Sequence, residues 1–214
     1  MAGTAREATG DQAWAGPLDD GAEAVLAGLH LELETRAADT GLLEVAYRTI
    51  DTPVGALLLA ATERGLVRVA YDREDHEQVL AALAAMVSPR ILQAPARLDP
   101  AAAQLEEYFA GRRTAFDLTL DRRLSRGFRL AVLAHLPEIA YGRTESYAEV
   151  ARATGNAAAV RAVGSACATN PLPVVVPCHR VLRSDGSLGG YIGGLEAKRA
   201  LLHLEAAQSP TGPR

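Results

Sequence analysis

The sequence predicts an α+β protein in which a small mixed domain precedes a mainly helical one. Residues 41–121 contain short runs of alternating or β-branched apolar positions, a pattern typical of strands. Residues 122–207 instead space their apolar positions as amphipathic helices do. The length of 214 residues and the hydrophobic content of 49% suit one large globular domain or two small ones.

Charge is divided unevenly along the chain. Residues 1–40 contain eight acids against two Arg, and their composition predicts a mostly disordered extension with only a short helix over 22–36. Residues 122–207 contain six acids against eleven Arg or Lys, although the whole chain has a net charge of −4. A local basic excess is what phosphate contact requires. A compositional preference for arginine is the alternative, since 21 Arg stand against one Lys.

The elements of the mixed domain follow from these runs. Strands are expected over 43–50, 54–61 and 66–71, with a hairpin turn at 62–65 and a further strand over 116–120. Helices are expected over 74–86 and 100–110. Pro100 suits the first turn of the second helix, because its missing N–H would be unpaired there anyway.

The helical domain begins with a helix over 128–136 that Pro137 closes. Ser146 and Glu149 then have the spacing of a capping box, which predicts a helix over 146–154. Gly155 and Asn156 end it, and a second helix is expected over 157–168. Two short helices joined by such a turn in a basic region predict a helix-turn-helix.

The second of these helices has two unlike faces. At about 100° per residue, Val160, Val163 and Cys167 share one arc and should face the core. The opposite side carries small residues and one cation: Ala158, Arg161, Ala162 and Ser165. This composition would let a nucleic-acid backbone approach closely, whereas an alanine-rich, solvated surface helix is the alternative.

A proline-rich stretch late in the chain carries the strongest chemical signal. The β-branched run 174–176 predicts a short buried strand, which Pro177 ends because proline cannot donate to a sheet. Cys178 follows at once, beside His179 and Arg180. Neighbouring positive charge favours thiolate over thiol, so we expect a nucleophilic cysteine.

The C-terminal helix offers a partner for this site. It is expected over 195–205, where Leu201 and Leu202 place Glu205 on the apolar face. A carboxylate on a buried face needs a partner, and pairing with His179 would give a Glu–His–Cys relay. A solvated carboxylate at the helix end is equally compatible with the spacing.

The two cysteines, Cys167 and Cys178, lack the spacing of a disulfide framework, which predicts a reducing, cytoplasmic compartment. The sequence contains neither an apolar leader at residues 1–20 nor a run as long as a membrane span. No cysteine precedes Cys167, so we expect no structural zinc. We expect no other cofactor.

Three motifs together resemble one protein family. They are Asn170-Pro171, Pro177-Cys178-His179-Arg180-Val181 and Gly190-Tyr191-Ile192-Gly193-Gly194. The region 128–205 closely resembles the O6-alkylguanine-DNA alkyltransferases, also called methylated-DNA–protein-cysteine methyltransferases. The resemblance implies a ribonuclease-H-like domain over 41–121, a winged-helix-like alkyl-acceptor domain over 122–207 and a tail over 208–214. It also implies a monomeric protein whose partner is double-stranded DNA containing O6-alkylguanine.

The resemblance implies a chemical role for five residues. Cys178 would attack the alkyl carbon on guanine O6 and keep the alkyl group irreversibly. His179 would deprotonate Cys178 through a water, and Glu205 would orient His179. Asn170 would hold the turn in shape, and Tyr147 would donate to guanine N3.

The resemblance also implies how DNA is bound. Arg161 would take the place of a flipped nucleotide while its helix, with Ala158, Ala162 and Ser165, lies in the minor groove. Backbone groups near Val181, Tyr191 and Ile192 would read the edge of the base. Two positions depart from some relatives, since Leu133 replaces an aromatic residue and Ile192 offers no hydroxyl.

Three other functions would use parts of the same sequence. A non-catalytic sensor of alkylated bases would lack the cysteine, and Cys178 is present. A helix-turn-helix regulator that senses oxidants through Cys178 would need neither Tyr147 nor Glu205. A Cys–His hydrolase is disfavoured, because adjacent Cys178 and His179 on one turn make direct contact between thiolate and imidazole awkward.

Overall fold

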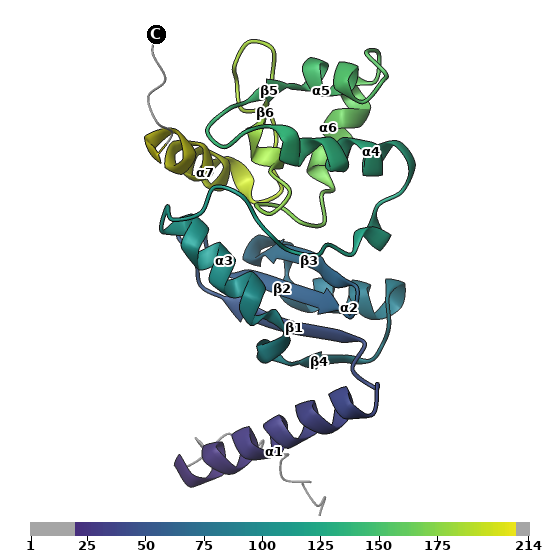
Figure 1. Ribbon diagram of the computed structural model, residues 1–214, viewed down its shortest axis with the longest axis vertical. Coiled ribbons are helices and arrows are strands. Elements are labelled where there is room, and N and C mark those ends of the chain that lie inside the picture. Colours follow the sequence, from purple (N-terminus) through teal and green to yellow (C-terminus); the bar gives the residue numbers. More distant parts are fainter. Residues whose placement is uncertain (1–19, 209–214) are drawn as a thin grey trace, which may run out of the picture.

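A four-stranded sheet organises the first half of the protein. The computed structural model describes residues 20–208. Its strands are β1 (Val45–Ile50), β2 (Leu57–Thr62), β3 (Gly65–Tyr71) and β4 (Ile91–Gln93), in the spatial order β3-β2-β1-β4. β2 pairs antiparallel with both β1 and β3, whereas β4 runs parallel to β1. The strand nearest the C-terminal half is β3 (Figure 1).

Helices cover both faces of this sheet because the strands alternate their side chains. Along β2, Leu57 and Leu59 point to one apolar cluster and Leu58 and Ala60 to the other. Helix α2 (His76–Met86) contributes Val79 and Leu83 to the second cluster, and α3 (Asp99–Phe109) contributes Leu105 and Tyr108 to the first. The expected hairpin is confirmed, with Thr62 paired to Gly65 across the turn.

Two strand predictions need correction. Residues 116–120 form no strand, apart from one bridge between Leu66 and Leu120. The backbone of Asp117 is instead hydrogen-bonded to the side chain of Gln104 on α3, at 2.8 Å for both bonds. The three-residue strand β4 was missed, because so short a run carries no periodic signal.

Helix α1 (Asp20–Asp39) is longer than the short helix expected over 22–36, so the extension is helical rather than disordered over these residues. It projects beyond β4 at the lower end of the molecule (Figure 1). The expected disorder of residues 1–19 and the tail after Gln208 lie outside the described residues.

The second half is mainly helical. It contains α4 (Gly127–His135), α5 (Tyr147–Ala153), α6 (Val160–Ala168) and α7 (Gly194–Gln208), with a small parallel pair formed by β5 (Glu145–Ser146) and β6 (Val181–Leu182). Single 3₁₀ turns lie at Asp72–Glu74, Pro95–Leu98, Arg122–Leu124, Leu136–Glu138 and Cys178–Arg180. Within the described residues, no helix is long and apolar enough to cross a bilayer.

The helix-turn-helix forms as α5 and α6. Its capping box is present, with Ser146 Oγ accepting from Glu149 N at 3.2 Å and Glu149 Oε2 accepting from Ser146 N at 2.6 Å. Helix α6 begins at Val160 rather than at residue 157, so Ala158 lies in the preceding turn. Val160 is 37% exposed and does not face the core, because the first helical residue lies at the helix end.

The two halves share one apolar core. A single cluster joins the α3 face of the sheet to residues of α4, α5, α6 and α7. Two hydrogen bonds from β3 reach the second half, since Val69 N and Arg68 Nη1 both donate to Pro171 O, at 2.8 and 3.2 Å. The stretch that contains Cys178 therefore lies between the sheet and the helical layer.

Candidate active site and nucleic-acid interface

The residues before Cys178 form buried turns and not the predicted strand. Val174, Val175 and Val176 are buried, but Val174 has a φ of 72°, a conformation that β-branched residues rarely adopt. Val176 N donates to Leu172 O at 2.8 Å and so closes a tight turn. The predicted strand over 174–176 was wrong, because the backbone here is hydrogen-bonded locally and not to a neighbouring strand.

Asn170 supplies that bonding. Its Oδ1 accepts from Leu172 N at 3.0 Å, and its Nδ2 donates to Val176 O at 2.8 Å. The same Nδ2 lies 3.2 Å from Cys178 Sγ. An amide side chain carries an acceptor oxygen and two donor N–H groups, so Asn170 can fix the turn and reach the sulfur at the same time.

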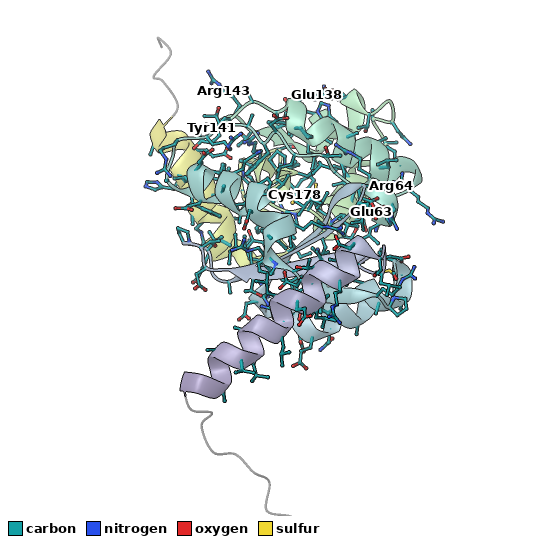
Figure 2. All side chains as sticks on the ribbon, turned by 60° about the horizontal axis from the view of Figure 1, so that its bottom comes forward. Glu63, Arg64, Glu138, Tyr141, Arg143 and Cys178 are labelled. Atoms are coloured by element: carbon teal, nitrogen blue, oxygen red, sulfur yellow. The ribbon has the colours of Figure 1, made fainter. Side chains whose placement is uncertain are left out.

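The thiol of Cys178 is enclosed. It is 1% exposed, and Figure 2 shows it within the body of the molecule. Burial raises the pKa of Cys178 to about 11, although the bond from Asn170 and the charge of Lys198 act in the opposite direction. The expectation that its neighbours favour thiolate is therefore wrong for the resting protein, in which the thiol is protonated.

His179 and Glu205 form the pair that the spacing suggested. His179 Nε2 lies 2.9 Å from Glu205 Oε1, and both residues are buried. Burial lowers the pKa of His179 even though Glu205 counteracts it, which keeps the imidazole neutral. Its Nδ1 is also buried and makes no hydrogen bond within the described part of the chain. A neutral ring held at Nε2 has Nδ1 available as a proton acceptor.

Glu205 is the centre of a larger network. Arg180 donates to it from Nε and Nη2, each at 2.9 Å, and Gly142 N donates at 3.1 Å. Tyr108 Oη donates to Oε1 at 2.8 Å. Burial alone would raise the pKa of Glu205, but the bonds from His179 and Arg180 lower it to about 2. The position of Arg180 next to Cys178 suggested that its charge would act on the thiol. In the structure that charge is instead directed at Glu205.

A cavity of about 470 Å³ lies between the helix-turn-helix and the glycine-rich loop. It is lined by Tyr147, Gly164, Ala168, Arg183, Gly189, Gly190, Tyr191 and Ile192. Burial raises the pKa of Tyr147 to about 12, and the Cys167 and Cys178 groups add to the effect. The Tyr147 phenol is therefore a neutral donor. A Cβ on Gly189 would lie 2.8 Å from Tyr147 Oη, so this wall requires glycine.

Two of the three expected base-contacting residues, Tyr191 and Ile192, line this cavity, whereas Val181 does not. The carbonyl of Val181 accepts from Lys198 Nζ at 2.6 Å, and Lys198 also bonds to Leu188 O. Lys198 is buried on α7 and so ties β6 to the start of the loop. Sequence reasoning missed Lys198, although its status as the single lysine was a usable signal.

The outer surface of α6 has the composition expected. Arg161, Ala162 and Ser165 are exposed, as is Ala158 in the turn before the helix, whereas Val163 and Cys167 are buried. The α6 residues Gly164 and Ala168 also line the cavity. The exposed face of the helix-turn-helix therefore adjoins this cavity.

Fold and site together define a helix-turn-helix protein with a buried cysteine beside a His–Glu pair. Comparison with known proteins identifies its family. Residues 45–122 match the family model "6-O-methylguanine DNA methyltransferase, ribonuclease-like domain", and residues 127–207 match the DNA binding domain of the same family. The chain belongs to the 6-O-methylguanine DNA methyltransferase family.

This chain aligns with almost the whole length of its relatives. It is 42% identical over 166 residues to the methylated-DNA–protein-cysteine methyltransferase of Mycobacterium bovis, covering 78% of this chain and 95% of the relative. The constitutive enzyme of Bacillus subtilis is 37% identical over 163 residues, covering 74% and 94%. The Mycobacterium tuberculosis O6-methylguanine methyltransferase crystal structure has a TM-score of 0.67 at 40% identity, covering 78% and 96%. Another structure shows that protein in complex with DNA, with a TM-score of 0.66.

Proposed function

We propose that this protein repairs DNA by direct reversal, moving a methyl or other alkyl group from O6 of guanine to Cys178. The arrangement around the sulfur carries the proposal. Asn170 Nδ2 lies 3.2 Å from Sγ, and the neutral His179 is held by Glu205. Tyr147 and Tyr191, whose pKa values the Cys178 group helps to raise, line a cavity of about 470 Å³. The relatives named above are methylated-DNA–protein-cysteine methyltransferases, and a structure of one holds DNA.

The reaction follows from the protonation states. The thiol proton passes through a water to His179 Nδ1, and the imidazolium that forms is stabilised by the ionised Glu205. The thiolate then attacks the alkyl carbon, so that an S–C bond forms as the C–O6 bond breaks. The electron pair of the broken bond goes to guanine, and Tyr147 donates a hydrogen bond or its proton to guanine N3.

The thioether product is chemically stable, and its cleavage is no part of the reaction proposed for His179 and Glu205. Each molecule is therefore consumed after one transfer. The acceptor must also stay a free thiol, as Cys178 and Cys167 both are. This requirement favours a reducing compartment, the cytoplasm. All of the named groups come from one chain, so we propose that a monomer is sufficient.

DNA binding would use the exposed face of α6. Small side chains at Ala158, Ala162 and Ser165 permit close approach to a minor groove, and Arg161 can enter the base stack. The guanine would then be rotated into the cavity beside Tyr147 and Tyr191. This assignment gives both the surface and the cavity a part in the same reaction.

The experiment that tests this function counts repaired lesions. A duplex containing one O6-methylguanine is incubated with increasing amounts of protein, and the remaining lesion is measured by nucleoside mass spectrometry. We expect one lesion to be lost per protein molecule, with no loss for Cys178→Ala. Folded wild-type protein that leaves the lesion unchanged would contradict the proposal. Oxidant-dependent binding to a specific undamaged sequence would instead support the redox regulator.

A further inference from the structure

The N-terminal sheet reaches the wall of the base cavity through Tyr71. This residue ends β3 and is 2% exposed, and its Oη lies 3.0 Å from the Oη of Tyr191. The two rings meet edge to face, with centroids 5.8 Å apart at 75°. Tyr191 lines the cavity, whereas Tyr71 lies behind it. The first domain therefore supports the cavity wall from outside.

The chain after Tyr191 lies close to the ring of Tyr71. A Cβ on Gly193 would lie 2.5 Å from Cζ of Tyr71, so position 193 excludes any side chain while Tyr71 is present. At Gly194 the nearest atom to an added Cβ would be Nη1 of Arg73, at 2.5 Å, which is the flexible end of a side chain, and Gly194 has a φ of 89°. The backbone at Gly193 is therefore packed directly against the Tyr71 ring.

Tyr71 is itself held in place. Its backbone N–H donates to Glu74 Oε1 at 2.8 Å, and Glu74 is paired with Arg68. Arg68 also bonds to Pro171 O, next to the Asn170 that contacts the sulfur. The support behind the wall is thus anchored to the same turn that presents Cys178.

The cavity wall also contacts a residue of the proposed reaction, His179. The Tyr191 ring lies edge to face against His179, with centroids 6.4 Å apart at 89°. Burial raises the pKa values of Tyr71 and Tyr191, so both phenols stay neutral and their contact is an uncharged hydrogen bond. A shift of Tyr191 would therefore disturb both the cavity shape and the packing of His179.

We propose that Tyr71 is a positioning residue that fixes the cavity wall formed by Tyr191 and Ile192, and so limits the size of alkyl group the protein accepts. The proposal rests on the proposed alkyl transfer. A benzyl group needs more room than a methyl group, so its transfer should gain more from a wall that can move. Removing the Tyr71 hydroxyl should therefore favour the large group relative to the small one.

The test compares two lesions in one duplex sequence, O6-methylguanine and O6-benzylguanine, under single-turnover conditions with saturating DNA. We expect Tyr71→Phe to raise the ratio of benzyl to methyl rate constants by about fivefold, the factor that one net hydrogen bond provides. Tyr47→Phe is the matched control, because it makes the same change on β1 beside the other apolar cluster. Its ratio should equal that of the wild type.

A merely structural role would lower both rate constants by the same factor, so an unchanged ratio in Tyr71→Phe overturns the inference. A second measurement does not depend on that variant folding well. Gly193→Ala should slow methyl transfer in the wild type but much less in a Tyr71→Ala background, and strictly additive effects would count against Tyr71. If the wild type transfers no methyl group at all, the proposed function has failed instead.

Discussion

Tyr108 donates a hydrogen bond to Glu205 over 2.8 Å although the two residues are 97 positions apart in sequence. Tyr108 belongs to α3 of the N-terminal half, and Glu205 belongs to α7 at the end of the second. The carboxylate that holds His179 is therefore itself held from both halves of the protein. This relationship explains why the first domain matters to a site whose motifs all lie after residue 169.

Tyr108→Phe should lower the free energy of unfolding by about 1.5–3 kcal/mol, because a buried hydrogen bond to a charged group is lost. It should also slow methyl transfer, since Glu205 loses one of its fixed donors. Urea denaturation and the single-turnover rate measure the two effects. A change below about 0.5 kcal/mol would show that Tyr108 contributes only packing.

Glu205→Gln should reduce the dependence of stability on acid. The pKa of Glu205 is lowered to about 2 from its usual 4.5, so ionised Glu205 stabilises the folded state. That contribution is fully present above about pH 4.5 and is lost as the pH falls toward about 2. The wild type should therefore lose more stability than Glu205→Gln across this window, measured by urea denaturation at a series of pH values.

The matched control for this variant is Glu63→Gln, at the exposed turn labelled in Figure 2. It should keep the acid dependence of the wild type. Equal acid dependence in wild type and Glu205→Gln would mean that Glu205 is not the ionised centre of the network.

Asn170→Ala should make Cys178 less reactive. The Asn170 N–H lowers the pKa of the thiol against the effect of burial, so its removal raises that pKa and reduces the thiolate fraction at any given pH. We expect alkylation of Cys178 by iodoacetamide, followed by peptide mass spectrometry, to slow by about tenfold per unit of pKa change. Asn156→Ala, on the exposed turn of the helix-turn-helix, should leave the rate unchanged. Equal rates in both variants would remove Asn170 from thiol activation.

Arg161→Ala should separate DNA engagement from chemistry. If Arg161 replaces the flipped guanine, its loss should slow transfer from duplex DNA by at least about tenfold, since unstacking a base costs a few kcal/mol. Transfer from the free base O6-benzylguanine needs no flipping and should be unaffected. Arg112→Ala, an exposed arginine of the first half, serves as the control. Equal slowing on both substrates would contradict the role.

Structure could be predicted from the sequence where local interactions determine it. The capping box of Ser146 and Glu149 predicted the start of α5. The spacing of Glu205 from Leu201 and Leu202 was compatible with a buried or a solvated carboxylate, and the carboxylate is buried. Prediction from the sequence failed where groups outside the local pattern determine the structure. The Val174–Val176 run looks like a strand, but Asn170 and Leu172 bond its backbone into turns. Arg180 adjoins Cys178 in sequence, yet folding directs it to Glu205.

Contacts between the two domains could not be predicted from the sequence either. Tyr71 and Tyr108 lie in ordinary strand and helix patterns, and nothing local distinguishes them from other core tyrosines. Their roles arise because β3 and α3 face the second half, which brings them to Tyr191 and Glu205. Such pairings depend on topology and cannot be read from periodicity.

The central claim is that Cys178 itself accepts the alkyl group, and locating that group tests it most directly. The protein is incubated with excess duplex DNA containing O6-methylguanine, digested and analysed by peptide mass spectrometry. We expect one methyl group per molecule, on the peptide containing Cys178, with Cys167 unmodified. A methyl group on Cys167, or none on either cysteine while the lesion disappears, would contradict it.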